Sequence, residues 1–162
     1  MIAYITGKLT HKAPTQAIID VGGLGYEVQI SLHTYAHLKG LTACKLFTHL
    51  HITGDAHTLY GFVSMAEKQW FLYLLGVNGV GPRVAMTILS SLKPDELQQA
   101  IISHSAATLQ SIKGIGEKAA RRIILELSSK VGKLTSLTEQ ADRKSTRLNS
   151  SHRFLSRMPS SA

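Results

Sequence analysis

The chain has 162 residues, enough for one sizeable domain or two small ones. It is 44% hydrophobic and 17% charged, a balance that favours a packed core and argues against wholesale disorder. Its formal net charge of +8 favours an anionic partner, which could be a nucleic acid or an acidic membrane surface.

Cysteine content and apolar runs restrict the class further. Cys44 is the only cysteine, which excludes an internal disulfide and a zinc site built on thiolates. The first twelve residues lack the basic head and apolar centre of a signal peptide. The longest apolar run, residues 71–77, is far shorter than the ~20 residues of a membrane span. We therefore expect a soluble cytoplasmic protein without a membrane partner.

Residues 1–63 carry the pattern of a small β-sheet domain. Five segments are rich in β-branched and aromatic side chains, namely residues 4–9, 16–21, 25–32, 44–53 and 58–63. Tyr26, Val28 and Ile30 alternate with polar residues, a period of two that is typical of a sheet with one exposed face. Five short strands predict an OB-like five-stranded β-barrel.

Residues 64–133 carry helical patterns instead. Helices are predicted over residues 64–77, 82–92, 94–104, 106–112 and 116–131. Ser64 fits a helix N-cap, and Pro82 and Pro94 fit the first turn of a helix. The predicted fold class is therefore α+β, a barrel followed by an all-helical domain. Residues 64–133 hold nine basic and five acidic side chains, against four and three in residues 1–63, so we expect the binding surface on the helical part.

Residues 134–162 are rich in Ser, Thr and Arg and show no sustained periodicity, which predicts a disordered tail. An alternative interpretation is that the stretch from Lys144 onward is not native, and resembles a junction or an out-of-frame translation.

One unit occurs twice in the helical part. Residues 77–89 (VNGVGPRVAMTIL) align with residues 112–124 (IKGIGEKAARRII) at an offset of 35 throughout, and each copy lies between two helical segments. The matching pairs are Gly79 with Gly114, Gly81 with Gly116, Arg83 with Lys118, Ala85 with Ala120 and Ile88 with Ile123. Self-similarity at a fixed offset indicates a duplicated unit.

The repeated pattern has a physical reading. Glycine permits backbone angles that other residues avoid and leaves amide groups bare, while Val80 or Ile115 anchors the turn in the core. The following helix turns its unpaired N–H groups and positive dipole end to the same place, which suits an anion. Arg83 and Lys118 add a full charge there. An alternative without a ligand is that both turns serve only to pack the helices tightly. The pattern is that of a helix-hairpin-helix motif, which holds DNA phosphates without reading sequence.

These repeats, together with residues 18–28 (IIDVGGLGYEV) and 55–62 (DAHTLYGF), closely resemble the RuvA family of Holliday-junction-binding proteins. The resemblance runs from Met1 to about Lys133. It implies an OB-like barrel with tandem helix-hairpin-helix motifs, and self-assembly into a tetramer or an octamer on a four-way DNA junction. It also implies a third domain that docks a RuvB-like motor ATPase. Since the sequence after residue 133 carries no such domain, we expect DNA binding without motor coupling.

The resemblance implies a set of phosphate-binding residues in the two hairpins: Gly79, Val80, Gly81, Arg83, Gly114, Ile115, Gly116, Lys118 and Arg122. It also implies an acidic pin at the junction centre, which would contain Asp55. The chain departs from the family pattern at two positions. Gly54 stands where a second pin acid is common, and Glu117 stands beside the phosphate site, where a basic or neutral residue is expected.

Other chemistries find less support in the sequence. No P-loop motif occurs, and we expect no cofactor, no metal site and no catalytic residue. His49, His51 and His57 could cluster on one barrel face, although solvated or packed histidines are the favoured reading. Two alternatives stay open: a hairpin-bearing repair enzyme (a glycosylase or nuclease) and a protein-interaction module. The enzyme would need a catalytic Lys–Asp pair or a carboxylate cluster.

Overall fold

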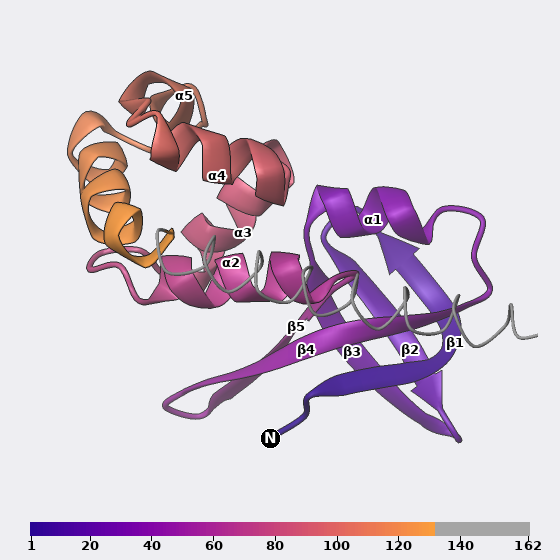
Figure 1. Ribbon diagram of the computed structural model, residues 1–162. Coiled ribbons are helices and arrows are strands. Elements are labelled where there is room, and N and C mark those ends of the chain that lie inside the picture. The colour runs from indigo at the N-terminus through magenta and orange to yellow at the C-terminus, as the bar shows by residue number, and fades with distance from the viewer. Residues whose placement is uncertain (132–162) are drawn as a thin grey trace, which may run out of the picture.

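The N-terminal part is a closed barrel of five strands. The computed structural model describes residues 1–131, so the predicted tail over residues 134–162 lies outside it. The strands are β1 (Tyr4–Ala13), β2 (Gln16–Val21), β3 (Leu24–Ile30), β4 (Ala43–Thr53) and β5 (Ala56–Phe62). Around the barrel they follow the order β1-β2-β3-β5-β4 (Figure 1). All pairs are antiparallel except β3 with β5.

Alternation along the strands builds the barrel core. Ala17, Ile19 and Val28 are fully buried, and their neighbours along β2 and β3 are at least partly exposed. The parallel contact between β3 and β5 depends on a glycine. A Cβ on Gly61 would lie 2.4 Å from the Cγ1 of Val28, so any larger residue would push the two strands apart.

A short helix follows β3, which the sequence analysis did not predict. The sequence predicted a strand over residues 25–32. In the structure β3 ends at Ile30, and α1 (Leu32–Leu38) follows. Ser31 is the N-cap, and its Oγ accepts a hydrogen bond from the Thr34 N–H at 3.0 Å. Leu38 is buried in the barrel core, so α1 closes one end of the barrel.

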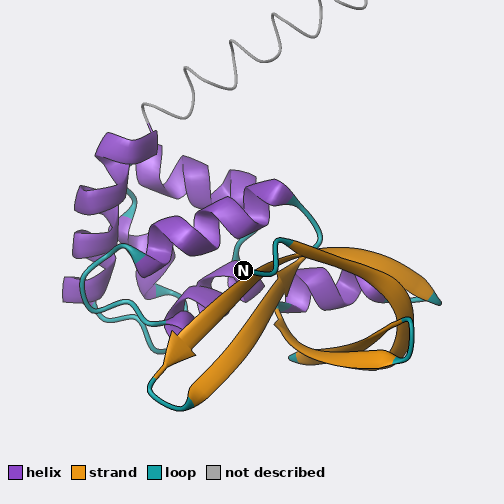
Figure 2. Ribbon diagram, turned by 90° about the horizontal axis from the view of Figure 1, so that it is seen from below, coloured by secondary structure: helices purple, strands orange, loops and turns teal. Residues whose placement is uncertain are grey.

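The helical part begins directly after β5. Its helices are α2 (Met65–Leu75), α3 (Pro82–Ser91), α4 (Pro94–Ile102), α5 (Ala106–Gln110) and a last helix over residues 117–131, which carries no label in Figure 1. Ser64 caps α2 through a hydrogen bond from the Glu67 N–H at 3.1 Å. Proline is the first residue of both α3 and α4, as predicted. Figure 2 shows the helices gathered on one side of the barrel.

Within residues 1–131, the barrel and the helical part each have a hydrophobic core. Phe62, the last residue of β5, belongs to the helical core, and its ring centroid lies 4.9 Å from that of Phe71 in α2. Trp70 is in the same core. The predicted architecture, an OB-like barrel followed by helices, is confirmed. Among the helices of residues 1–131, none is long and apolar enough to cross a membrane.

Candidate nucleic-acid interface

The first hairpin loop joins α2 to α3 by a turn that requires glycine. Gly79 has a φ of +83°, in the left-handed region. Val80 is 8% exposed, and its N–H donates to the Val77 carbonyl at 3.1 Å. Gly81 is the N-cap of α3, and its carbonyl accepts from the Ala85 N–H at 3.0 Å. These two bonds fix the loop on either side of its glycines.

The second hairpin loop, between α5 and helix 117–131, repeats this geometry bond for bond. Gly114 has a φ of +92°. Ile115 is 6% exposed, and its N–H donates to the Ile112 carbonyl at 3.1 Å. The Ala120 N–H donates to the Gly116 carbonyl at 3.0 Å. The duplication read from the sequence is therefore a structural duplication as well.

Bare amide donors remain at the surface of both loops. Four exposed glycines have N–H groups without a hydrogen-bond partner in residues 1–131, namely Gly79, Gly81, Gly114 and Gly116. The apolar residues between them differ, because the N–H groups of Val80 and Ile115 are already bonded within the turn. Val80 and Ile115 thus hold the loops in the core, and the glycines offer the donors.

Arg122 connects the two hairpins, a contact that the sequence analysis did not foresee. Its Nη1 donates to the Asn78 carbonyl in the first loop at 3.4 Å. The same atom lies 3.6 Å from the position that a Cβ on Gly79 would take. Since Arg122 belongs to the helix that follows the second loop, this contact brings a cation of the second hairpin beside the glycines of the first.

The remaining charges of the hairpins divide into paired and unpaired groups. Arg121 Nη2 lies 2.5 Å from Glu117 Oε1, an exposed ion pair one helical turn apart. Glu117 is therefore offset by Arg121. Arg83 and Lys118 are exposed, and neither has an ion-pair partner in the described part of the chain.

The hairpin of β4 and β5 carries the predicted pin residue at its tip. Gly54 and Asp55 form a two-residue turn between Thr53 and Ala56, and all four residues are exposed. Gly54 has a φ of +54°. The hairpin extends well beyond the barrel wall (Figure 1). Its turn, which contains Asp55, is therefore at its far end.

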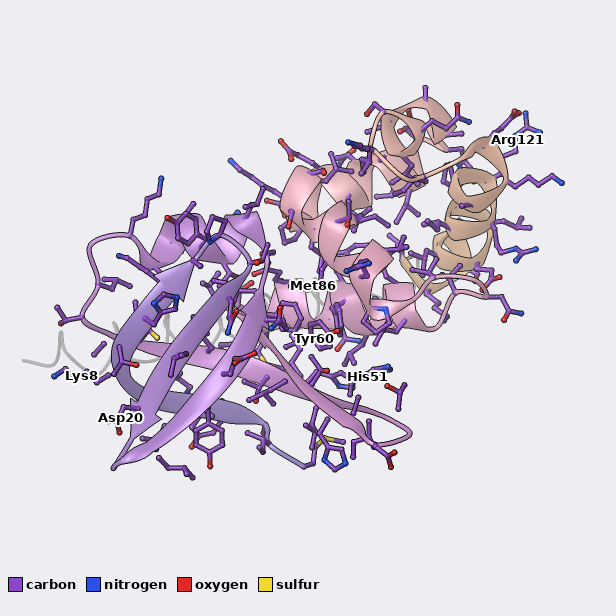
Figure 3. The ribbon with its side chains drawn as sticks, turned by 180° about the vertical axis from the view of Figure 1, so that it is seen from behind. Lys8, Asp20, His51, Tyr60, Met86 and Arg121 are labelled. Atoms are coloured by element: carbon purple, nitrogen blue, oxygen red, sulfur yellow. The ribbon has the colours of Figure 1, made fainter. Side chains whose placement is uncertain are left out.

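The histidines of this hairpin lie on different faces. His49 and His51 are two residues apart on β4 and share a face, with ring centroids 6.2 Å apart. His57 pairs with Ile52 and lies on the opposite face. Figure 3 shows His51 and Tyr60 on the hairpin beside the helices. In residues 1–131, no group of three His, Cys, Asp or Glu side chains could hold a metal ion.

Burial and neighbouring cations perturb two groups on this face. The pKa of His49 is lowered by burial, by His51 and by Lys68 of α2. The pKa of Tyr60 is raised by burial, and the positive charge of Arg83 in α3 partly opposes that rise. The positive charge of Arg83, in the first hairpin, thus acts on a side chain of the β4–β5 hairpin.

A buried hydrogen-bond network joins the barrel to the helices. Glu67 of α2 is fully buried. Its Oε1 accepts from Ser31 Oγ, and its Oε2 accepts from Thr34 Oγ1 at 2.9 Å. The Leu32 N–H donates to Ser90 Oγ of α3 at 3.0 Å. The first turn of α1 is thus bonded to both α2 and α3, which orients the hairpins relative to the barrel.

Comparison with known proteins agrees with both halves of this structure. Residues 1–61 match the family model described as RuvA N terminal domain. Residues 71–129 match the model described as SAM-like Helix-hairpin-helix tandem. The chain belongs to the RuvA family. The family assignment was predicted from the sequence, and it is confirmed.

Several relatives bear the name "Holliday junction branch migration complex subunit RuvA". The one from Amoebophilus asiaticus is 67% identical over 135 residues, which cover 83% of this chain and 70% of the relative. The one from Cytophaga hutchinsonii is 52% identical over 133 residues, covering 82% and 67%. The one from Geobacter sulfurreducens is 47% identical over 136 residues, covering 83% and 68%. The two family models, over residues 1–61 and 71–129, together span the barrel and both hairpins.

Proposed function

We propose that this protein binds four-way DNA junctions and serves as the DNA-binding subunit of a RuvAB-type branch migration complex in recombination and repair. The observation that carries the proposal is the pair of hairpin loops with the same geometry and exposed amide donors at Gly79, Gly81, Gly114 and Gly116. Two such donors per loop match the oxygens of a phosphodiester group, with no need to read a base. Family membership does not favour the glycosylase or nuclease alternative.

Individual residues have distinct roles in this proposal. The four glycines donate to phosphate oxygens, and Val80 and Ile115 hold their loops in place. Arg83, Lys118 and Arg122 supply positive charge beside them, and Asp55 repels phosphates at the junction centre. The proposed division is a barrel domain over residues 1–63 and a DNA-binding domain over residues 64–133.

The proposed assembly follows from membership of the RuvA family. A tetramer or octamer of this chain would hold the open junction in the cytoplasm, and a RuvB-like ATPase would be the motor of the complex. The expectation that this chain does not couple to the motor concerns residues after 133, which lie outside the described residues. The proposed role is non-catalytic, because strand movement would come from the motor. Mass measurement in solution, with and without a synthetic four-way junction, tests the assembly. A monomer under both conditions would contradict it.

Competition between DNA shapes tests the function. We expect the protein to bind a synthetic four-way junction more tightly than a linear duplex of the same base composition in a gel-shift titration. Equal affinities for the two shapes would contradict junction-specific binding.

Salt dependence tests the phosphate contacts. With two contacts per subunit, a tetramer would neutralise about eight phosphates, which gives a log–log salt slope of about −7. We expect the double variant Arg83→Ala, Lys118→Ala to have a distinctly shallower slope. The matched control is Lys8→Ala, Lys39→Ala, which removes the same charge from the exposed surface of the barrel part. Lys8 lies on the far side of the barrel from the helices (Figure 3). Equal slopes for the two double variants would show that Arg83 and Lys118 do not contact phosphate.

A further inference from the structure

Four basic side chains from three elements face the same region, and we call them the basic strip: His49 and His51 of β4, Lys68 of α2 and Arg83 of α3. The rings of His49 and His51 are 6.2 Å apart. Lys68 acts electrostatically on His49, and Arg83 acts on Tyr60. Tyr60 pairs directly with His49 across the β4–β5 hairpin. The strip thus continues from the first helix-hairpin-helix motif onto the β4–β5 hairpin.

No acidic side chain neutralises the strip within residues 1–131. The ion pair of the described residues joins Arg121 to Glu117 in the second hairpin, outside the strip. Glu67, which precedes Lys68 in the chain, is buried and hydrogen-bonded to α1. Asp55 lies at the tip of the β4–β5 hairpin, and it forms no ion pair. The strip therefore has no internal counter-charge in the described part of the chain.

Aromatic contacts hold the two histidines of the strip in place. The His49 ring lies 5.7 Å from the Phe71 ring, and the His51 ring lies 6.4 Å from the Tyr60 ring. Tyr60 and Phe71 are themselves 5.0 Å apart and pack on the helical core. Side chains fixed in this way lose little freedom on binding a ligand, so their charge is available at low entropic cost.

We propose that the basic strip is a second phosphate-binding surface, which contacts the DNA strand between the first hairpin loop and the tip at Asp55, and that DNA binding protonates His49 and His51. The inference rests on the proposed function, because it needs DNA on the hairpin face. A phosphate beside the strip stabilises the imidazolium form of a histidine over its neutral form, which favours proton uptake when DNA binds. By linkage, the protein takes up protons on binding and affinity increases as the pH falls.

The test is a titration of a four-way junction at constant ionic strength between pH 8 and pH 6, with calorimetry in two buffers of different ionisation enthalpy. For each histidine whose pKa DNA raises by one unit, affinity increases up to about tenfold over this range. We expect net proton uptake by the wild type and a much smaller pH effect for the double variant His49→Gln, His51→Gln. The matched control His57→Gln changes the opposite face of the same hairpin and should behave as the wild type.

Two further measurements keep the outcomes distinct. Because His49 packs against Phe71, the single variant His51→Gln is a second test, and it should lose part of the proton uptake. Binding of the wild type to the junction at pH 8 tests the proposed function, whereas the change from pH 8 to pH 6 tests the strip. The inference would be overturned if proton uptake and pH dependence were the same in the wild type, in the double variant His49→Gln, His51→Gln and in the single variant His51→Gln.

Discussion

Removal of the Glu67 carboxyl group should weaken the joint between barrel and helices. In the variant Glu67→Ala, two buried hydroxyl groups, on Ser31 and Thr34, lose the acceptors to which they donate. Each buried group left without a partner costs about 1–3 kcal/mol, so we expect a loss of about 2–6 kcal/mol in the free energy of unfolding. A loss of this size is large against the total stability of a small domain.

The assay is equilibrium unfolding in urea, followed by circular dichroism and by Trp70 fluorescence. Trp70 is a residue of α2 and lies in the helical core, so its emission reports on the helical part. Glu67→Gln keeps a similar shape and can still bond both hydroxyl groups, so it should retain more stability than Glu67→Ala. The matched control is Glu126→Ala, in helix 117–131, where the side chain is partly exposed; it should change stability by about 0.5 kcal/mol or less.

The preference for a junction over a linear duplex is a second measurement for Glu67→Ala. If the network orients the hairpins relative to the β4–β5 tip, Glu67→Ala should reduce the preference for a junction over a linear duplex, measured where the variant is folded. A loss below about 1 kcal/mol, together with an unchanged preference, would refute the reasoning that this network joins the two parts.

Three more predictions concern backbone geometry and pH. Gly61→Ala should destabilise the barrel by about 1–3 kcal/mol in thermal or urea unfolding, because the new Cβ would lie 2.4 Å from Val28 Cγ1; an unchanged midpoint would contradict the tight contact. Gly79→Ala should reduce the free energy of unfolding by about 1–3 kcal/mol, because Gly79 has a φ of +83°. It should also weaken junction binding in a gel-shift titration. Gly81→Ala should reduce stability less, because Gly81 has a negative φ. The pKa of His49 is lower in the folded state, so the unfolded state binds more protons and stability falls as the pH drops below about 6.5. His49→Gln should flatten that decline, and an identical pH profile would rule His49 out as its source.

The fold could be predicted in most of its elements because local patterns agree with the tertiary structure. The strands alternate, Ser64 caps α2, and prolines start α3 and α4. The missed helix α1 is short, at seven residues. Its segment also reads as a continuation of β3, so only the cap at Ser31 marks the change.

The hairpins were predictable because they are duplicated, whereas the contacts between distant segments were not. Arg122 could be named from its position, but its bond to Asn78 depends on how two loops pack. Glu67 lies in the first turn of α2, where the local sequence indicates no more than a favourable position for an acid. Its partners Ser31 and Thr34 lie 36 and 33 residues away, a distance that no local pattern reports. The basic strip likewise combines three elements, so periodicity within any one of them does not reveal it.

Amide spectroscopy of the two loops tests the central claim most directly. With ¹⁵N-labelled glycine, the N–H signals of Gly79, Gly81, Gly114 and Gly116 can be followed as a four-way junction is added. Gly22 and Gly23, in the β2–β3 turn, serve as internal controls. The account predicts downfield shifts and slower hydrogen exchange for the four hairpin glycines and little change for the controls. A junction that binds while those four amides stay unchanged would contradict it.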